Sequence, residues 1–111
     1  MNNYSSSKDV GGDARYTEKN VPLMVARGAR AFLENAPMRW HAQEEEERVY
    51  RKIPYGPLLD VFVIDMRSYR GPNTHNRQDA LNDESQYLGP VQLEWLKREL
   101  KASKATWKVI A

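Results

Sequence analysis

The spacing of apolar residues predicts a helix in the first third of the chain. Its apolar positions recur every three or four residues, the period of one helix face, and they are Val25, Ala29, Phe32, Leu33 and Ala36. Pro22 suits the first turn, where the missing N–H leaves no helical hydrogen bond unmade. Asn35 and Pro37 are stop signals. We therefore expect a helix that opens at Asn20-Val21-Pro22, after a polar loop over residues 1–19.

A second helix is predicted to begin at Gly89-Pro90, again with proline in the first turn. Its apolar stripe consists of Leu93, Leu96 and Leu100, with Trp95 alongside. Cations late in the segment complement the negative end of the helix dipole; they are Lys97, Arg98 and Lys101. Ser103-Lys104 closes the helix.

Three segments predict strands. Arg48–Ile53 alternates between polar and apolar residues, as a short strand does, and Tyr55-Gly56-Pro57 then breaks the pattern. Leu58–Met66 is almost continuously apolar and β-branched, which is typical of a strand covered on both faces. Thr106–Ala111 begins another strand. The first two strands could form a hairpin, and the strand–helix–strand order predicts parallel strands joined by a right-handed crossover.

The predicted fold class is α/β, and the chain has the features of a partial domain. Its last apolar run stops at Val109-Ile110-Ala111, and Met1 could be an internal methionine. We expect that neighbouring segments are missing on both sides, so that residues 1–111 form one truncated domain. Such a chain buries only part of a core and is expected to be marginally stable by itself.

Composition and charge exclude several classes of protein. Cysteine is absent, which excludes disulfides, thiolate metal sites and a cysteine nucleophile. Seventeen Lys and Arg face fifteen Asp and Glu, and the signs are interspersed except in the acidic run Glu44–Glu47, which we interpret as a solvated loop. Without a basic stripe, we expect no nucleic-acid partner. No apolar run predicts a transmembrane segment, and the first residues lack the pattern of an export signal.

The clearest candidate for chemistry is Asp65-Met66-Arg67. Residues two apart in a strand share a face, so Asp65 and Arg67 are expected to point the same way. They lie at the carboxyl end of a buried strand, where ligand crevices form in open α/β sheets. The planar fork of arginine suits an anionic substrate because it binds two phosphate oxygens at once. The alternative interpretation is an Asp–Arg ion pair that ties the following loop to the sheet.

Other residues give weaker signals by themselves. The polar stretch over residues 68–88 is long for a loop without structure, and such loops are often functional. His41 and His75 have no partner at ligand spacing, so we interpret both as surface residues. Asn2-Asn3 alone would be a cap or a turn. No metalloprotease helix, P-loop or glycine-rich dinucleotide motif is present.

Several segments taken together are more specific than any of these residues. In chain order they are Arg15–Lys19 (RYTEK), Ala31–Arg39 (AFLENAPMR), Arg48–Arg51 (RVYR) with Tyr55-Gly56, Asp65–Arg70 (DMRSYR), Leu88-Gly89 with Gln92 and Trp95-Leu96, and Ser103–Ala111 (SKATWKVIA). In order and spacing this set resembles the PhoD family of alkaline phosphatases. The resemblance covers nearly the whole chain.

The resemblance implies a fold and a reaction. The fold is a metallophosphoesterase-like sandwich of two β-sheets flanked by helices, of which this chain would be an internal fragment. The reaction is the hydrolysis of phosphomonoesters and phosphodiesters at a site containing iron and calcium, since bound metals polarise the phosphate. The resemblance also implies a periplasmic or secreted parent, whose export signal would lie outside this chain.

The resemblance further implies roles for particular residues. Asn2 and Asn3 match paired asparagines beside the family's metal ligands, so one of the two is expected to approach a metal. Asp65 and Arg67 match a D-x-R segment near the active site, and Arg67 and Arg70 are expected to bind the substrate phosphate. The family's aspartate and histidine ligands are absent from this chain, so we expect the chain alone to bind no metal and to be inactive.

A function of another class is also open. The chain could be a small anion-binding or protein-interaction module without catalysis, which would use Arg67, Arg70 and Arg77. The flanking coding sequence separates the two hypotheses, because an upstream Asp-Asp-His-Glu run and downstream histidines would favour the phosphatase.

Overall fold

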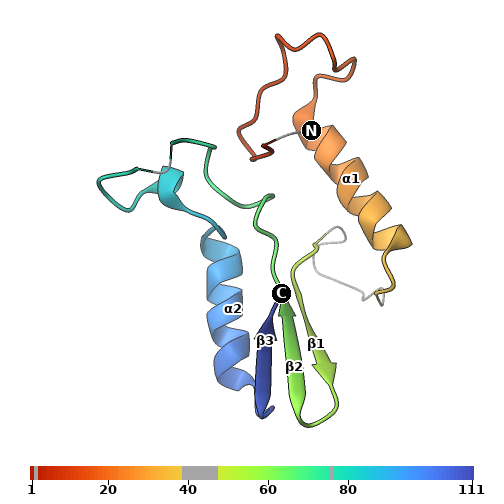
Figure 1. The fold of residues 1–111 in the computed structure, drawn as a ribbon, viewed down its shortest axis with the longest axis vertical. Coiled ribbons are helices and arrows are strands. Elements are labelled where there is room, and N and C mark those ends of the chain that lie inside the picture. Colours follow the sequence, from red (N-terminus) through yellow and green to blue (C-terminus); the bar gives the residue numbers. More distant parts are fainter. Residues whose placement is uncertain (2, 39–47, 76) are drawn as a thin grey trace.

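The computed structural model describes residues 1, 3–38, 48–75 and 77–111, and it confirms the predicted α/β class. Asn2, His41 and the run Glu44–Glu47 lie outside the described residues. Figure 1 shows α2 beside a sheet at one end of the molecule, while α1 and the N-terminal loop form a second group. In chain order the elements are α1 (Val21–Asn35), β1 (Arg51–Tyr55), β2 (Leu59–Val63), the 3-10 turn η1 (Asp83–Ser85), α2 (Pro90–Ala102) and β3 (Trp107–Ile110).

The described residues form one mixed sheet in the order β1-β2-β3. β1 and β2 are an antiparallel hairpin with Lys52 opposite Phe62, and β2 and β3 are parallel with Val61 opposite Val109. The predicted hairpin and the predicted parallel pair are therefore both confirmed. The second sheet of the implied sandwich is not among the described residues.

The strand bounds differ from the prediction at both ends of the hairpin. β1 begins at Arg51 rather than Arg48, and β2 ends at Val63 rather than Met66. Ile64 still pairs with the residue after the last strand, because its N–H donates to the carbonyl of Ala111 at 2.8 Å. Beyond this point the backbone turns away from the sheet, which hydrophobic pattern alone did not indicate.

The core lies between α2 and one face of the sheet. Phe62 is 0% exposed and belongs to a buried cluster with Tyr50, Trp95 and Leu96. The rings of Tyr50 and Trp95 approach to 4.9 Å between centroids, a separation typical of favourable aromatic pairs. This cluster fixes α2 against β2, and it therefore fixes the loop that connects them.

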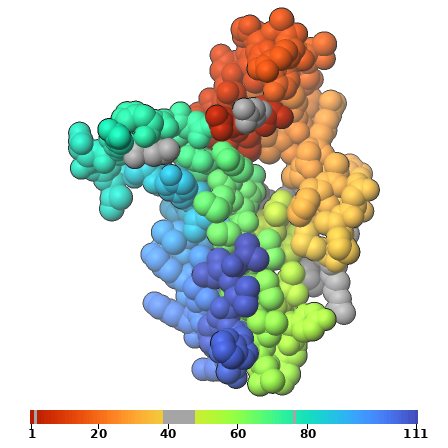
Figure 2. Space-filling view, viewed as in Figure 1, coloured from red at the N-terminus to blue at the C-terminus, as the bar shows by residue number. Residues whose placement is uncertain are grey.

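The opposite face of the sheet is largely uncovered. Leu59 and Val61 are half-buried, and Trp107 is 68% exposed. Figure 2 shows atoms of β3 and β2 at the surface of this view. The expectation that β2 is covered on both faces is therefore not met by the described residues, because α2 packs on one face only.

The two helices bury only part of the predicted apolar stripes, namely Trp95 and Leu96 in α2 and Leu33 in α1. In α2 the buried side chains are Gln92, Trp95 and Leu96, whereas Leu93 is 39% exposed. In α1 the buried residues are Val21 and Leu33, and the helix begins with the Asn20 side chain accepting the N–H of Leu23 at 3.0 Å. Phe32 is 47% exposed, although it belongs to the predicted apolar stripe. No helix in the described ranges is long and apolar enough to cross a bilayer.

A buried carboxylate joins the far end of α2 to the hairpin. Asp60 accepts a hydrogen bond from the Ser103 hydroxyl at 2.6 Å and lies 3.0 Å from the Lys52 ammonium. The Ser103 hydrogen bond and then the Lys52 interaction lower the pKa of Asp60 below its usual value. The charged form of Asp60 therefore stabilises the folded chain.

This carboxylate predicts how stability depends on pH. An aspartate in the unfolded chain titrates near pH ~3.9, so the stabilisation by Asp60 is fully present above that pH. It is lost as the pH falls through the lower pKa of the folded state, because the unfolded state then binds more protons. Urea denaturation between pH 7 and pH 2.5 measures the effect. In Asp60→Asn this part of the pH dependence should disappear; an unchanged profile would contradict the prediction.

Candidate functional site

Asp65 shapes the chain directly after β2. Its side-chain Oδ1 accepts the backbone N–H of Arg67 at 2.8 Å and that of Ser68 at 2.9 Å. Aspartate favours such turns because its short carboxylate can bond to the backbone two residues on. The prediction that Asp65 and Arg67 share a strand face is therefore wrong, since the carboxylate bends the backbone into a turn. We call residues 65–68 the Asp65 turn.

The Arg67 side chain lies at the surface of this turn. Its Nη1 donates to the backbone carbonyl of Tyr4 at 3.4 Å, and the residue is exposed. No ion pair within 4 Å joins Arg67 to Asp65 among the described contacts, so the alternative interpretation of an Asp–Arg ion pair is not supported. Asp65 instead acts on Arg67 through the backbone.

The N-terminal segment lies against the loop that follows the turn. The Ser6 hydroxyl donates to the carbonyl of Arg70 at 3.3 Å, and the Asn73 amide donates to the carbonyl of Asn3 at 3.0 Å. These contacts join residues more than sixty positions apart in the sequence. Asn3 therefore lies near the loop that follows the Asp65 turn, and its φ of 49° places it in the left-handed region.

The Arg70 side chain contacts a different residue from the one that Arg67 contacts. Its guanidinium carbon is 5.0 Å from the centre of the Tyr87 ring, a cation–π distance. Its Nε is buried and has no hydrogen-bond partner in the described part of the chain. Of the two arginines predicted to bind substrate, Arg67 thus lies in the Asp65 turn and Arg70 follows it, but no described contact brings their guanidinium groups together.

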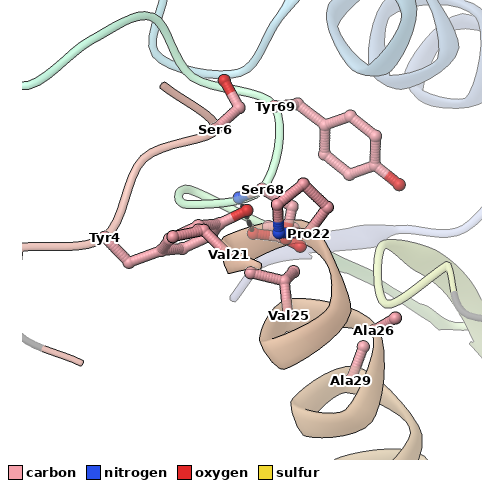
Figure 3. A pocket seen from close by; sticks show the side chains of 10 residues that line it. Tyr4, Ser6, Val21, Pro22, Val25, Ala26, Ala29, Ser68 and Tyr69 are labelled. Atoms are coloured by element: carbon pink, nitrogen blue, oxygen red, sulfur yellow. Dashed lines mark hydrogen bonds between the residues drawn. The ribbon is translucent and has the colours of Figure 1, made fainter. Parts of the chain in front are cut away.

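A pocket of about 290 Å³ separates the Asp65 turn from α1. Figure 3 shows the Tyr4 ring extending from the N-terminal segment toward Ser68 and the start of α1. Burial, and then the negative charge of Asp65, raises the pKa of the Tyr4 phenol, so Tyr4 stays neutral near pH 7. The α1 wall is apolar and consists of Val21, Pro22, Val25, Ala26 and Ala29.

A buried glutamine, for which the sequence predicted no role, forms hydrogen bonds to the first residue of the turn. The Gln92 side-chain Oε1 accepts the Asp65 N–H at 2.7 Å, and its Nε2 donates to the carbonyls of Asp65 at 2.8 Å and Leu88 at 2.9 Å. Gln92 is 0% exposed. The available signal was a polar residue three and four positions before the apolar pair Trp95 and Leu96, which places it on the same helix face.

Comparisons with known proteins decide the family. A family model described as PhoD-like phosphatase matches residues 1–111. The chain belongs to the PhoD-like phosphatase family. It is 30% identical over 104 residues to alkaline phosphatase D of Bacillus subtilis (strain 168), a match that covers 84% of this chain. A solved structure titled "Structure of PhoD" superposes with a TM-score of 0.63 at 29% identity and covers 99% of this chain. The PhoD-like chain spans 18% and 22% of the length of these two proteins.

The described residues do not provide a complete set of ligands for the metals that the family resemblance implies. Over residues 1, 3–38, 48–75 and 77–111, no group of three or more His, Cys, Asp or Glu could hold a metal ion. His75 is exposed, and the backbone carbonyl of Asn3 already accepts from Asn73. An amide side chain such as that of Asn3 cannot by itself form the carboxylate and imidazole centre that a transition metal requires.

Proposed function

We propose that this chain is part of a phosphatase that hydrolyses phosphate esters, and that Arg67 binds the substrate phosphate. The observation that carries the proposal is the exposed Arg67 guanidinium at the carboxyl end of β2, in a chain that matches the family model along its whole length. In open α/β sheets this end of the strands is where ligands bind. The metal dependence of the reaction, with iron and calcium as its ions, remains part of the proposal.

Arg67 has the chemistry for this role. A guanidinium keeps its charge at any pH where a protein folds, and its fork matches two oxygens of a phosphate. Its contact with the Tyr4 carbonyl orients the group without neutralising it, because a carbonyl carries no formal charge. Asp65 makes no ion pair with Arg67 among the described contacts, since its Oδ1 accepts from the backbone. An anion near the turn would therefore meet an oriented guanidinium that no described carboxylate binds directly.

Arg70 is proposed as a second, weaker contact. Leaving a buried donor without a partner costs about 1–3 kcal/mol, and an oxygen of a bound phosphate would satisfy the buried Nε of Arg70. Its position over Tyr87 restrains the guanidinium, however, so its contribution is expected to be smaller than that of Arg67.

The test is steady-state kinetics on the full-length gene product that contains residues 1–111. Arg67→Ala is expected to lower kcat/KM by about ten- to a hundredfold, since hydrogen bonds to charged groups contribute about 1.5–3 kcal/mol. Arg67→Lys should recover only part of the loss, because lysine keeps the charge but not the fork. Arg70→Ala should have a smaller effect than Arg67→Ala.

Arg27→Ala is the matched control, because Arg27 is an exposed arginine on α1. It should leave kcat/KM unchanged. The isolated 111-residue chain, which we propose to be inactive, serves as the blank. The proposal fails if Arg67→Ala retains normal kcat/KM, or if its activity falls only in step with a lower melting temperature.

A further inference from the structure

We propose that Gln92 is a positioning residue for phosphate binding. From α2 it fixes the backbone of the Asp65 turn, and through that turn it fixes the direction of the Arg67 side chain. The inference rests on the proposed function of Arg67 and assigns the element that keeps Arg67 in place. Gln92 itself is fully buried and does not contact the substrate.

The Gln92 side-chain amide pairs with the backbone of Asp65, two residues beyond the end of β2. β1 begins at Arg51, opposite Val63, so the backbone of Asp65 has no strand partner on that side among the described residues. Gln92 supplies both halves of the missing pairing, because its oxygen accepts the Asp65 N–H and its nitrogen donates to the Asp65 carbonyl. The side-chain amide therefore satisfies both the N–H and the carbonyl of Asp65, as the backbone of a neighbouring strand would.

The orientation of this amide is determined by its partners. Its nitrogen carries two N–H groups, and the carbonyls of Asp65 and Leu88 accept both. The oxygen must then face the Asp65 N–H. Leu88 lies four residues earlier, two residues before the first residue of α2, so the Gln92 side chain is anchored beside the start of its own helix as well as on the turn.

A continuous set of contacts leads from this amide to the guanidinium. Gln92 holds the backbone of Asp65, and the Asp65 carboxylate holds the N–H groups of Arg67 and Ser68. The Tyr4 carbonyl then holds the end of the Arg67 side chain. Because α2 is fixed to the core through Trp95 and Leu96, the position of Arg67 depends on the helix through one buried side chain.

The test measures the affinity for inorganic phosphate by isothermal titration calorimetry, with the full-length gene product. Gln92→Met keeps the length of the side chain but removes its hydrogen bonds, and it is expected to raise the Kd for phosphate roughly tenfold, because small displacements of a binding group have large effects. In an Arg67→Ala background the same substitution should have little further effect. Such coupling is expected when two residues act as one unit.

Ser103→Ala is the matched control. Ser103 is also buried, caps the far end of the same helix, and bonds to Asp60 rather than to the turn. It should lower the melting temperature and leave the phosphate Kd within about twofold, as expected for a distant site. A Gln92→Met defect that is equally large with and without Arg67 would overturn the inference.

Gln92→Glu provides a second, independent variant if Gln92→Met does not fold. Burial raises the pKa of a carboxyl, so this glutamic acid is expected to be protonated at pH 5, where it offers both a donor and an acceptor, and ionised at pH 8. The Kd relative to the unsubstituted protein should therefore be near normal at pH 5 and raised at pH 8. A ratio that is the same at both values overturns the inference.

The outcomes separate the two proposals. If Arg67→Ala weakens phosphate binding but neither Gln92 variant does, the inference about Gln92 is wrong and the proposed function stands. If Arg67→Ala leaves the phosphate Kd unchanged, the proposed role of Arg67 is wrong, and the positioning role of Gln92 falls with it.

Discussion

Phe62→Ala is expected to lower the free energy of unfolding by about 3–5 kcal/mol. Phe62 is the largest fully buried side chain of the described residues, and it packs in one cluster with Tyr50, Trp95 and Leu96. Its removal leaves a cavity that the rigid ring of Trp95 cannot fill. Urea denaturation of the full-length gene product, followed by tryptophan fluorescence, measures the change. A domain is stable by only about 5–15 kcal/mol in total, so a lower soluble yield is also expected.

The other phenylalanine of the chain gives the matched comparison. Phe32 lies on α1 and is 47% exposed, so Phe32→Ala makes the same chemical change without opening a buried cavity. Its effect is expected to stay within about 1 kcal/mol, because exposed positions tolerate substitution. Equal losses for the two variants would contradict the placement of the core between α2 and β2.

The sequence predicted the regular elements well because their signals are local. Pro22 lies in the first turn of α1 and Pro90 is the first residue of α2, and the β-branched run of β2 predicts a strand whatever its partners are. The ends were less accurate. β2 stops at Val63 because β1 begins opposite it, at Arg51, and because Asp65 bonds to the backbone ahead. Both causes depend on tertiary placement or on a side-chain choice that the apolar pattern does not contain.

The sequence indicated candidate residues around the Asp65 turn, but it did not predict their geometry. The D-x-R segment pointed to Asp65 and Arg67, yet the relation between them is a turn through the backbone rather than a shared strand face. Gln92 is among the residues that carry the resemblance. The sequence predicted no role for it, because a buried glutamine has no periodic signal of its own. Its function depends on which carbonyls and N–H groups remain unpaired where the sheet ends, and only the assembled fold shows this.

Gly89 shows most directly how closely α2 approaches the site. Its φ is +71°, a backbone conformation that residues with a side chain rarely adopt. A Cβ there would lie 2.6 Å from the carbonyl oxygen of Tyr69. Gly89→Ala is therefore expected to lower the free energy of unfolding by about 2–6 kcal/mol, from backbone strain of about 1–3 kcal/mol together with overpacking of a similar size. The Tyr69 carbonyl is backbone, so the turn itself must move to relieve the contact.

That movement should also affect phosphate binding. Tyr69 follows the Asp65 turn, and Gly89 immediately precedes α2, from which Gln92 holds that turn. We expect Gly89→Ala to weaken phosphate binding in the molecules that still fold, which titration calorimetry on the monomeric fraction measures.

Gly56→Ala separates the two causes of the expected loss in Gly89→Ala. Gly56 has a φ of +69° in the hairpin turn, but a Cβ there would meet no atom within 4 Å. Gly56→Ala should therefore show the backbone strain alone, about 1–2 kcal/mol, with normal affinity for phosphate. If Gly89→Ala is no more destabilising than Gly56→Ala and binds phosphate normally, the start of α2 does not press on Tyr69 as the structure indicates. A larger loss of both stability and affinity at Gly89 is the expected result, because only there does the added methyl group meet the backbone that carries the site.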